Sequence, residues 1–309
     1  MEIITTIPPY ASYIKKVAKH PMISGVRLNT VMPVKESLDE LVSRVAKEVS
    51  PKEVWIDLKC RQIRVTNYAS VPYQQLEISH KIKVKTPTTA YFSDGEEQAT
   101  LAEIIDGNKL IMLDGPKRVV GPGESINITD PSLEIEGYLT QKDKEYISAA
   151  KKAGVHNYML SYVESADDIE KVFEIDSEAN VLAKIESKKG LNFVEKEFSQ
   201  YQGMFAKHKN KVHLMAARGD LYVEVSPPHT ILNEVKKIAE KDSNAVGASR
   251  IMASMNKSPV PSCSDLSDVG YLMMCRYKRL MIGDDLCFDE RALISALNVL
   301  QGINEDFKP

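Results

Sequence analysis

Two carboxylates and a lysine stand at the ends of consecutive apolar, β-branched runs in this sequence. Lys184 and Glu186 close a run that begins at Val181, and Asp220 closes the next run, which begins at Val212. Residues two apart on a strand point to the same side, so Lys184 and Glu186 are predicted to project together. Two carboxylates at neighbouring strand ends could share a hard divalent cation such as Mg²⁺ or Mn²⁺. The lysine beside them would then face an anionic substrate.

Polar residues also stand at the ends of nearly all the remaining apolar runs. They are Arg27, Asn29, Asp57, Lys59, Ser161, Arg218, Ser249, Arg250, Asp284 and Asp285. A charge at the end of a buried strand needs a partner or a function, because an unpaired buried charge is costly. For any single residue, a salt bridge is as good an explanation as a site. Together the residues favour a site, and zinc is disfavoured because none of the six histidines ends a run.

The runs that carry these residues predict a parallel sheet. Amphipathic helical segments, such as 38–49 and 289–303, separate them. Eight parallel strands, each followed by a helix, close into a (β/α)₈ TIM barrel, in which the chemistry lies at the carboxyl ends of the strands. An open doubly wound sheet is the alternative. The predicted strands are Glu2–Ile7, Gly25–Asn29, Val54–Lys59, Tyr158–Val163, Val181–Glu186, Val212–Asp220, Ala245–Met252 and Arg279–Asp285.

The interval 66–131 departs from this alternation. Asp94-Gly95, Asp106-Gly107 and Asp114-Gly115 separate short alternating runs there, and such dipeptides favour tight turns between antiparallel strands. A small all-β domain is therefore predicted after the third strand. We expect residues 1–65 and 136–309 to form the barrel, and residues 66–135 to form a β-barrel-like lid domain.

Composition disfavours several classes of protein. The 309 residues carry 40 Lys+Arg and 43 Asp+Glu, so a formal net charge of −3 leaves no global field that would hold nucleic acid. The four cysteines include no C-x-x-C pair, and a reducing cytoplasm is expected. No stretch approaches the ~18 apolar residues that favour a membrane span. No signal-peptide pattern begins the sequence either, so we expect no membrane partner.

Two segments resemble the pyruvate kinase family. AKIESKKGL (183–191) is similar to the family's lysine-and-glutamate strand, and MAARGDLYVEV (215–225) is similar to its metal-binding A-R-G-D-L-x-V-E segment. Matches at VRLN, IDLKCRQIR, GYLTQKDKEYI and LMIGDD keep the same order, so the resemblance covers nearly the whole chain. It implies a TIM barrel of the phosphoenolpyruvate/pyruvate type and a phosphotransferase activity. Related aldolases and lyases on the same barrel share the metal, the lysine and enolpyruvate.

The resemblance implies roles for the residues that face the metal and the phosphoryl group. Lys184 would stabilise the transferring phosphoryl group and the enolate. Glu186 and Asp220 would hold Mg²⁺ or Mn²⁺. Arg27 would face the phosphoryl group, and Ser161 would help to bind it.

The remaining roles concern the proton, the nucleotide and the substrate carboxylate. Ser249 would lie near the side from which the proton is delivered, and Arg64 and Asn29 would lie on the nucleotide side. The substrate carboxylate would meet backbone N–H groups at the start of a helix. These are the N–H groups of Arg218, Gly219 and Asp220.

Departures from the family pattern fall on the monovalent-cation and nucleotide side. Val31 and Leu58 stand where the family has a serine and a threonine, and the loss of two oxygen ligands argues against a K⁺ site. Arg61 brings a permanent cation close by, which either replaces K⁺ or is a solvated loop residue. The chain ends at Pro309, where the family continues into a C-terminal domain. We therefore expect a short member that lacks this domain.

These features leave three hypotheses for the function. The first is a divergent pyruvate kinase that transfers phosphoryl from phosphoenolpyruvate to ADP or another nucleoside diphosphate, yielding pyruvate and ATP. The second is a metal-dependent lyase or aldolase, or another phosphoenolpyruvate-using enzyme, with a different second substrate, because the departures spare the enolate side. The third is a noncatalytic regulatory relative, against which the retained metal carboxylates and lysine argue. Assembly into a homo-oligomer stays open.

Overall fold

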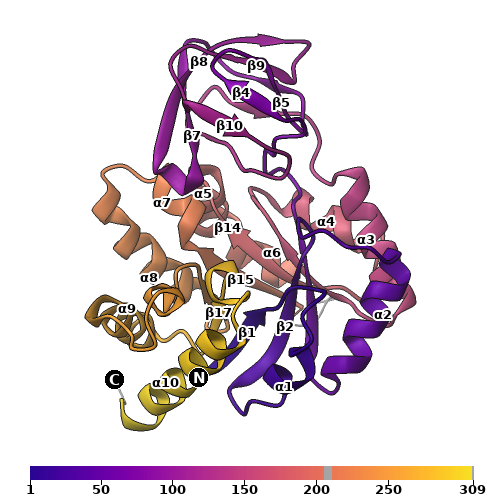
Figure 1. Ribbon diagram of the computed structural model, residues 1–309, viewed down its shortest axis with the longest axis vertical. Coiled ribbons are helices and arrows are strands. Elements are labelled where there is room, and N and C mark those ends of the chain that lie inside the picture. The colour runs from indigo at the N-terminus through magenta and orange to yellow at the C-terminus, as the bar shows by residue number, and fades with distance from the viewer. Residues whose placement is uncertain (205–210, 308–309) are drawn as a thin grey trace.

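In the computed structural model, which describes residues 1–204 and 211–307, eight parallel strands form a closed barrel (Figure 1). Each strand pairs with the next barrel strand along the chain, and the first pairs with the last to close the ring. The (β/α)₈ prediction is confirmed, and the open doubly wound alternative is wrong. The barrel strands are β1 (Glu2–Thr6), β2 (Ile23–Asn29), β3 (Glu53–Leu58), β13 (Asn157–Leu160), β14 (Asn180–Ile185), β15 (Val212–Ala217), β16 (Val246–Ala248) and β17 (Arg279–Ile282).

Helices surround this barrel (Figure 1). The predicted segment 38–49 forms one of them, and a capping box begins it: the Glu40 N–H donates to the Ser37 hydroxyl, and the Glu40 carboxylate accepts from the Ser37 N–H. Its apolar face, which includes Leu41 and Val45, is buried. The described helices are α1 (Ile14–Ala18), α2 (Leu38–Val49), α3 (Gln141–Lys152), α4 (Ala166–Phe173), α5 (Lys188–Lys196), α6 (Phe198–Met204), α7 (Arg218–Glu224), α8 (Ile231–Lys241), α9 (Cys263–Met274) and α10 (Glu290–Asp306). None of these helices is long and apolar enough to cross a membrane.

Four barrel strands, β13, β15, β16 and β17, end three or four residues earlier than the sequence predicts. β15 runs directly into α7, so Asp220 lies on a helix rather than on the strand. β16 stops early because Ser249 (φ 73°) and Arg250 (φ 60°) adopt left-handed conformations that cannot continue a strand. β17 gives way to a 3₁₀ turn that holds Asp284. Turns at the barrel mouth therefore position these polar side chains.

Nine short strands lie between β3 and α3 and form three small antiparallel sheets at one end of the barrel (Figure 1). Their apolar side chains form a core of their own, which includes Val71, Phe92, Leu101 and Leu110. We refer to this segment, 66–135, as the lid. Its strands are β4 (Ala69–Val71), β5 (Leu76–Glu77), β6 (Ile82–Lys83), β7 (Thr88–Phe92), β8 (Glu97–Ile105), β9 (Lys109–Met112), β10 (Arg118–Val120), β11 (Asn127–Ile128) and β12 (Glu134–Ile135).

Side chains fill the inside of the barrel below the site. A separate apolar cluster there includes Trp55, Met159, Met215 and Met281. Gly25 on β2 leaves room for the indole, since an added Cβ would lie 3.0 Å from Trp55 Cδ1. The barrel is therefore a packed core rather than a pore, and polar chemistry is confined to its mouth.

Candidate active site

A cavity of about 290 Å³ opens between the carboxyl ends of the barrel strands and the lid. All of the predicted site residues except Asp57, Ser161 and Arg218 line it. Among the charged and polar side chains of its wall are Arg27, Asn29, Lys59, Arg64, Asp94, Lys184, Glu186, Asp220, Ser249, Arg250, Asp284 and Asp285.

Lys184 projects from β14 and is almost completely buried at the bottom of this cavity. Its ammonium Nζ lies 2.8 Å from Ser161 Oγ, 3.0 Å from Glu186 Oε1 and 3.3 Å from Asp57 Oδ1. Burial alone would lower the pKa of Lys184, but the Asp57 and Glu186 carboxylates raise it above its ordinary value. Lys184 is therefore a fixed positive charge at neutral pH.

Glu186 directly follows β14, and Asp220 lies in the first turn of α7, which follows the adjacent parallel strand β15. The backbone N–H of Tyr162 donates to Glu186 Oε2 at 2.7 Å, and the Tyr162 hydroxyl lies 3.1 Å from Asp220 Oδ1. Burial raises the pKa of Glu186 to about 7; the charge of Lys184 opposes this shift, and that of Asp220 adds to it. The charge of Asp220 thus disfavours ionisation of Glu186, as expected of two carboxylates that would share one cation.

These oxygens suit a hard divalent cation that keeps several water ligands. Within residues 1–204 and 211–307, no group of three or more His, Cys, Asp or Glu side chains stands ready to hold a metal. Mg²⁺ is commonly bound through only one or two carboxylates, with waters and substrate oxygens completing its octahedron. The donor set of Glu186 and Asp220 therefore fits such an ion.

Arg27 spans the mouth of the barrel between two carboxylates. Its Nε donates to Asp57 Oδ2 at 3.0 Å, and its Nη1 donates to Asp284 Oδ1 and to Thr6 Oγ1, both at 2.8 Å. Lys59 Nζ approaches the same Asp57 Oδ2 at 2.7 Å. Burial would raise the pKa of Asp57, but Arg27, Lys184 and Lys59 hold it well below its ordinary value.

Ser161 and Arg218 support the site from outside the cavity. Ser161 is fully buried: its hydroxyl donates to the Leu58 carbonyl at 2.9 Å and accepts from Lys184. In this conformation the hydroxyl positions the lysine, and its contact with a phosphoryl group stays a prediction. The Arg218 guanidinium donates to the Ala248 carbonyl and the Asp268 carboxylate and does not line the cavity. Only the backbone of Arg218, next to Gly219, is therefore available for the predicted contact with a substrate carboxylate.

Arg64 and Ser249 both line the cavity. Arg64 Nη1 donates to the Gly123 carbonyl at 2.6 Å, and Nη2 donates to Gln62. Its buried Nε has no hydrogen-bond partner in the described part of the chain. Ser249 holds a left-handed backbone next to Gly219, where an added Cβ would lie 3.5 Å from Ser249 Oγ.

The lid contributes two residues that the sequence analysis missed. Asp94, in the 3₁₀ turn η1 (Ser93–Gly95), reaches the cavity, where partial desolvation raises its pKa and the Asp220 charge adds to that shift. Asn127 on β11 donates from Nδ2 to Asp220 Oδ1 at 2.9 Å and to the Tyr162 hydroxyl at 2.6 Å. Turn dipeptides revealed the lid, but no local signal indicated which of its residues face the barrel.

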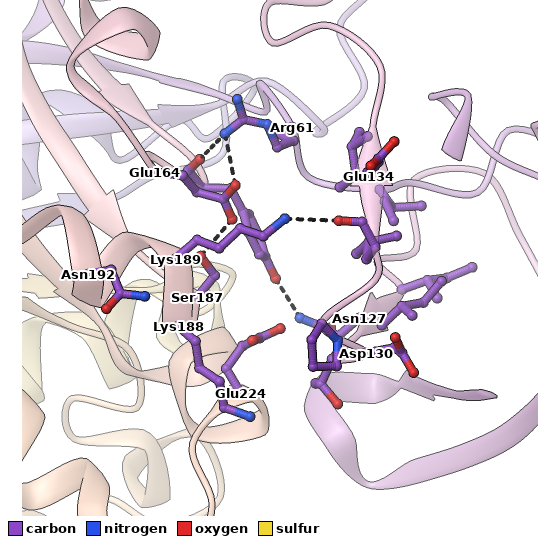
Figure 2. A pocket seen from close by; sticks show the side chains of 18 residues that line it. Arg61, Asn127, Asp130, Glu134, Glu164, Ser187, Lys188, Lys189, Asn192 and Glu224 are labelled. Carbon is purple, nitrogen blue, oxygen red and sulfur yellow. Dashed lines mark hydrogen bonds and ion pairs between the residues drawn. The ribbon is translucent and has the colours of Figure 1, made fainter. Parts of the chain in front are cut away.

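A second cavity, of about 470 Å³, lies beside the first where the lid joins the barrel (Figure 2). Arg61 and Glu164 lie on its barrel side, while Asn127 and Glu134 lie on the opposite wall (Figure 2). Arg61 donates to Asp168 at 2.6 Å, and its guanidinium lies 4.8 Å from the Tyr138 ring centroid. Arg61 therefore neither faces the Asp57 cluster nor stands free in solvent, so both predicted roles for it are wrong.

Comparison with known proteins gives a consistent assignment. The family described as pyruvate kinase, barrel domain, matches residues 53–282. Pyruvate kinase 1 of Saccharomyces cerevisiae is 29% identical over 191 residues, which cover 58% of this chain and 35% of the yeast protein. The pyruvate kinase of Thermotoga maritima is 28% identical over 194 residues, covering 60% of this chain and 39% of its own length. That of Thermoplasma acidophilum is 22% identical over 316 residues, covering 92% and 54% respectively.

The aligned part of this chain spans between about a third and about half of the length of these relatives. The family match nevertheless covers most of the barrel, from β3 to the end of β17, and includes the strands that carry Lys184, Glu186 and Asp220. The resemblance predicted from the sequence is confirmed: this chain belongs to the pyruvate kinase family.

Proposed function

We propose that the protein transfers a phosphoryl group from phosphoenolpyruvate to a nucleoside diphosphate in a divalent-cation-dependent, pyruvate kinase-like reaction. The observation that supports this most is the convergence of Lys184, Glu186 and Asp220 in one cavity at the barrel mouth. Phosphoryl transfer depends on positioning and charge stabilisation more than on covalent chemistry by the protein. A buried lysine with two carboxylates nearby offers both.

Lys184 would stabilise the charge that develops during transfer. The bond between the enol oxygen and phosphorus breaks, a bond to the terminal phosphate oxygen of the acceptor forms, and the enolate left behind takes a proton at its methylene carbon. The Lys184 ammonium is held by Asp57, Glu186 and Ser161, so no reorganisation is needed to present it. Ser249 would lie on the side from which the proton arrives.

Glu186 and Asp220 would hold Mg²⁺ or Mn²⁺. When bound, such a cation would polarise substrate oxygens and neutralise developing negative charge. Tyr162 would keep the two carboxylates in register, since its backbone N–H binds one and its hydroxyl lies within hydrogen-bond distance of the other. Asn127 would couple this arrangement to the position of the lid.

The anionic groups of the substrates would meet separate parts of the cavity wall. Arg27 would face the phosphoryl group, Asn29 beside it would lie on the nucleotide side, and the backbone around Gly219 would face the carboxylate. Arg64 would bind the nucleotide phosphates, and its buried, unpartnered Nε supports this role because a buried donor is costly to leave unpaired.

A second candidate is enolate chemistry without phosphoryl transfer, as in a lyase or aldolase. The observation that favours it is the Asp284 carboxylate on Arg27, which occupies the place assigned to the phosphoryl group. Incubating the protein with phosphoenolpyruvate, Mg²⁺ and a panel of nucleoside diphosphates, and measuring pyruvate and nucleoside triphosphate together, separates the two. Equal amounts of both products support phosphoryl transfer, whereas binding of pyruvate and metal without nucleotide-linked turnover supports the second candidate.

A further inference from the structure

The Asp284 carboxylate bridges two groups at the phosphoryl side of the cavity. One oxygen, Oδ1, accepts from Arg27 Nη1 at 2.8 Å, and the other, Oδ2, accepts from Asn29 Nδ2 at 2.7 Å. The carboxylate comes from the turn after β17, whereas both donors lie on β2. It thus makes the two-point contact that an anionic ligand would make with the same donors.

Little donor capacity is left on Arg27 or Asn29 while Asp284 is in place. A guanidinium has five N–H groups. Four of those of Arg27 donate to Asp57, Thr6 and Asp284: one from Nε, two from Nη1 and one from Nη2. One Nη2 N–H remains. The Asn29 carbonyl oxygen accepts from the Val31 N–H at 3.2 Å, so this side chain is engaged at both ends.

Asp284 also completes the charge balance of the cluster. Arg27, Lys59 and Lys184 are its cations, and Asp57, Glu186 and Asp284 are the carboxylates they contact. With Glu186 ionised, the cluster is neutral in formal charge with Asp284 and carries one net positive charge without it. A dianionic phosphoryl group would therefore meet a neutral cluster and a like charge at the point of contact.

Asp284 differs in exposure from the other carboxylates of this cluster. Its side chain is 43% exposed, whereas that of Asp57 is fully buried and that of Glu186 is 2% exposed. The loss of Asp284 therefore leaves no cavity in the core, and its contacts affect the properties of the site more than the stability of the barrel.

We propose that Asp284 is a specificity-determining residue that competes with a phosphoryl group for Arg27 and Asn29. The site consequently discriminates against phosphorylated enol acids relative to unphosphorylated 2-oxo acids that bind through the same carboxylate. This inference rests on the proposed function, because it takes Arg27 as the residue that faces the phosphoryl group.

The test compares the affinities of phosphoenolpyruvate and pyruvate, each with saturating Mg²⁺, by calorimetry in the absence of nucleotide. D284N and D284G both remove the charge, and the second also removes the side chain in case the amide restores the contact. D285N is the matched control, because it removes the same charge from the neighbouring residue of the same turn. Melting temperatures show that each variant is folded.

The measured quantity is the affinity for phosphoenolpyruvate divided by the affinity for pyruvate. We expect this ratio to be at least ~10-fold higher in D284N and D284G than in the parent, which corresponds to ~1.4 kcal/mol. We expect D285N to change this ratio less than threefold, about 0.7 kcal/mol. An unchanged ratio in both Asp284 variants, or an equal change in D285N, would overturn the inference. The parent and the same variants are also assayed with phosphoenolpyruvate, Mg²⁺ and nucleoside diphosphates. If the affinity ratio shifts as expected but none of these proteins forms nucleoside triphosphate in that assay, the proposed reaction fails and the role of Asp284 stands.

Discussion

The Lys184 ammonium lies 3.3 Å from Asp57 Oδ1, although the two residues come from strands that are not neighbours. β3 and β14 both pair with β13, so this contact crosses the mouth of the barrel above the intervening strand. Asp57 also binds Arg27 and Lys59. One buried carboxylate therefore gathers three cations at the place where a phosphoryl group would be transferred.

The two proposed metal ligands give the first prediction. Replacing Glu186 by Gln, or Asp220 by Asn, removes a charged oxygen ligand and leaves too few protein ligands for the cation. Each variant should lose Mg²⁺-dependent turnover while it keeps its melting temperature within a few degrees. E224Q, on the same helix as Asp220, is the control. Mg²⁺-dependent activity at parental level in D220N would remove the metal assignment.

Lys184 gives the second prediction. Lys184→Met keeps most of the volume but removes the charge, and one such group is typically worth ~10² to 10³ in rate. Pyruvate binding with Mg²⁺ should survive, since the carboxylate is assigned to the backbone around Gly219. Lys59→Met is the control: it also removes a cation that contacts Asp57, but Lys59 makes no ion pair with Glu186. This variant should lose less of the rate than Lys184→Met. Comparable single-turnover rates in the two variants would contradict a special role for Lys184.

Independence from K⁺ is the third prediction. Val31 and Leu58 offer methyl groups where K⁺ would need oxygen ligands, and the oxygens of Asp57 are bound by three cationic side chains. Exchanging K⁺ for tetramethylammonium at constant ionic strength should leave the initial rate unchanged. Arg61→Ala should lower the melting temperature through its buried contact with Asp168, with no change in the response to K⁺. Strong activation of the parent by K⁺ would show that a monovalent site exists despite these residues.

Glu224 gives the fourth prediction, on stability and pH. Burial raises the pKa of Glu224 from 4.5 to about 7, with Lys188 opposing the shift. The folded chain thus binds this proton more tightly than the unfolded chain, so the carboxyl lowers the free energy of unfolding as pH rises from about 4.5 to about 7. The full effect above that range is ~3 kcal/mol.

E224Q resembles the protonated side chain and should escape this penalty. In EDTA, its free energy of unfolding in urea should match that of the parent at pH 4.5 and exceed it at pH 8. A difference between the two proteins that is the same at both pH values would show that Glu224 is not buried in the way observed.

Most of the fold follows from local patterns in the sequence. Alternating β-branched runs and amphipathic segments predict the barrel, and turn dipeptides such as Asp106-Gly107 predict the lid. The strand-end rule also places Lys184 and Glu186 together, because side-chain direction repeats every two residues along a strand. These features depend on neighbours close in the chain.

The partners of individual polar side chains do not follow from local patterns. Arg61 pairs with Asp168, 107 residues away, and the Ser161 hydroxyl turns to Lys184 instead of the cavity. Asp94 reaches the site only because the lid packs on α7, where Gly95 approaches Val223. Each of these placements depends on the packing of distant segments, which composition and spacing do not encode.

The most direct test of the proposed function measures nucleoside triphosphate and pyruvate in the same reaction. ³¹P NMR of the parent protein with phosphoenolpyruvate, Mg²⁺ and a panel of nucleoside diphosphates, with pyruvate measured in parallel, reports whether the phosphoryl group reaches a nucleotide. The structure and the family assignment predict one nucleoside triphosphate for each pyruvate formed, and neither product in D220N. Pyruvate release with inorganic phosphate only, or no reaction with any nucleotide, would contradict phosphoryl transfer at this site.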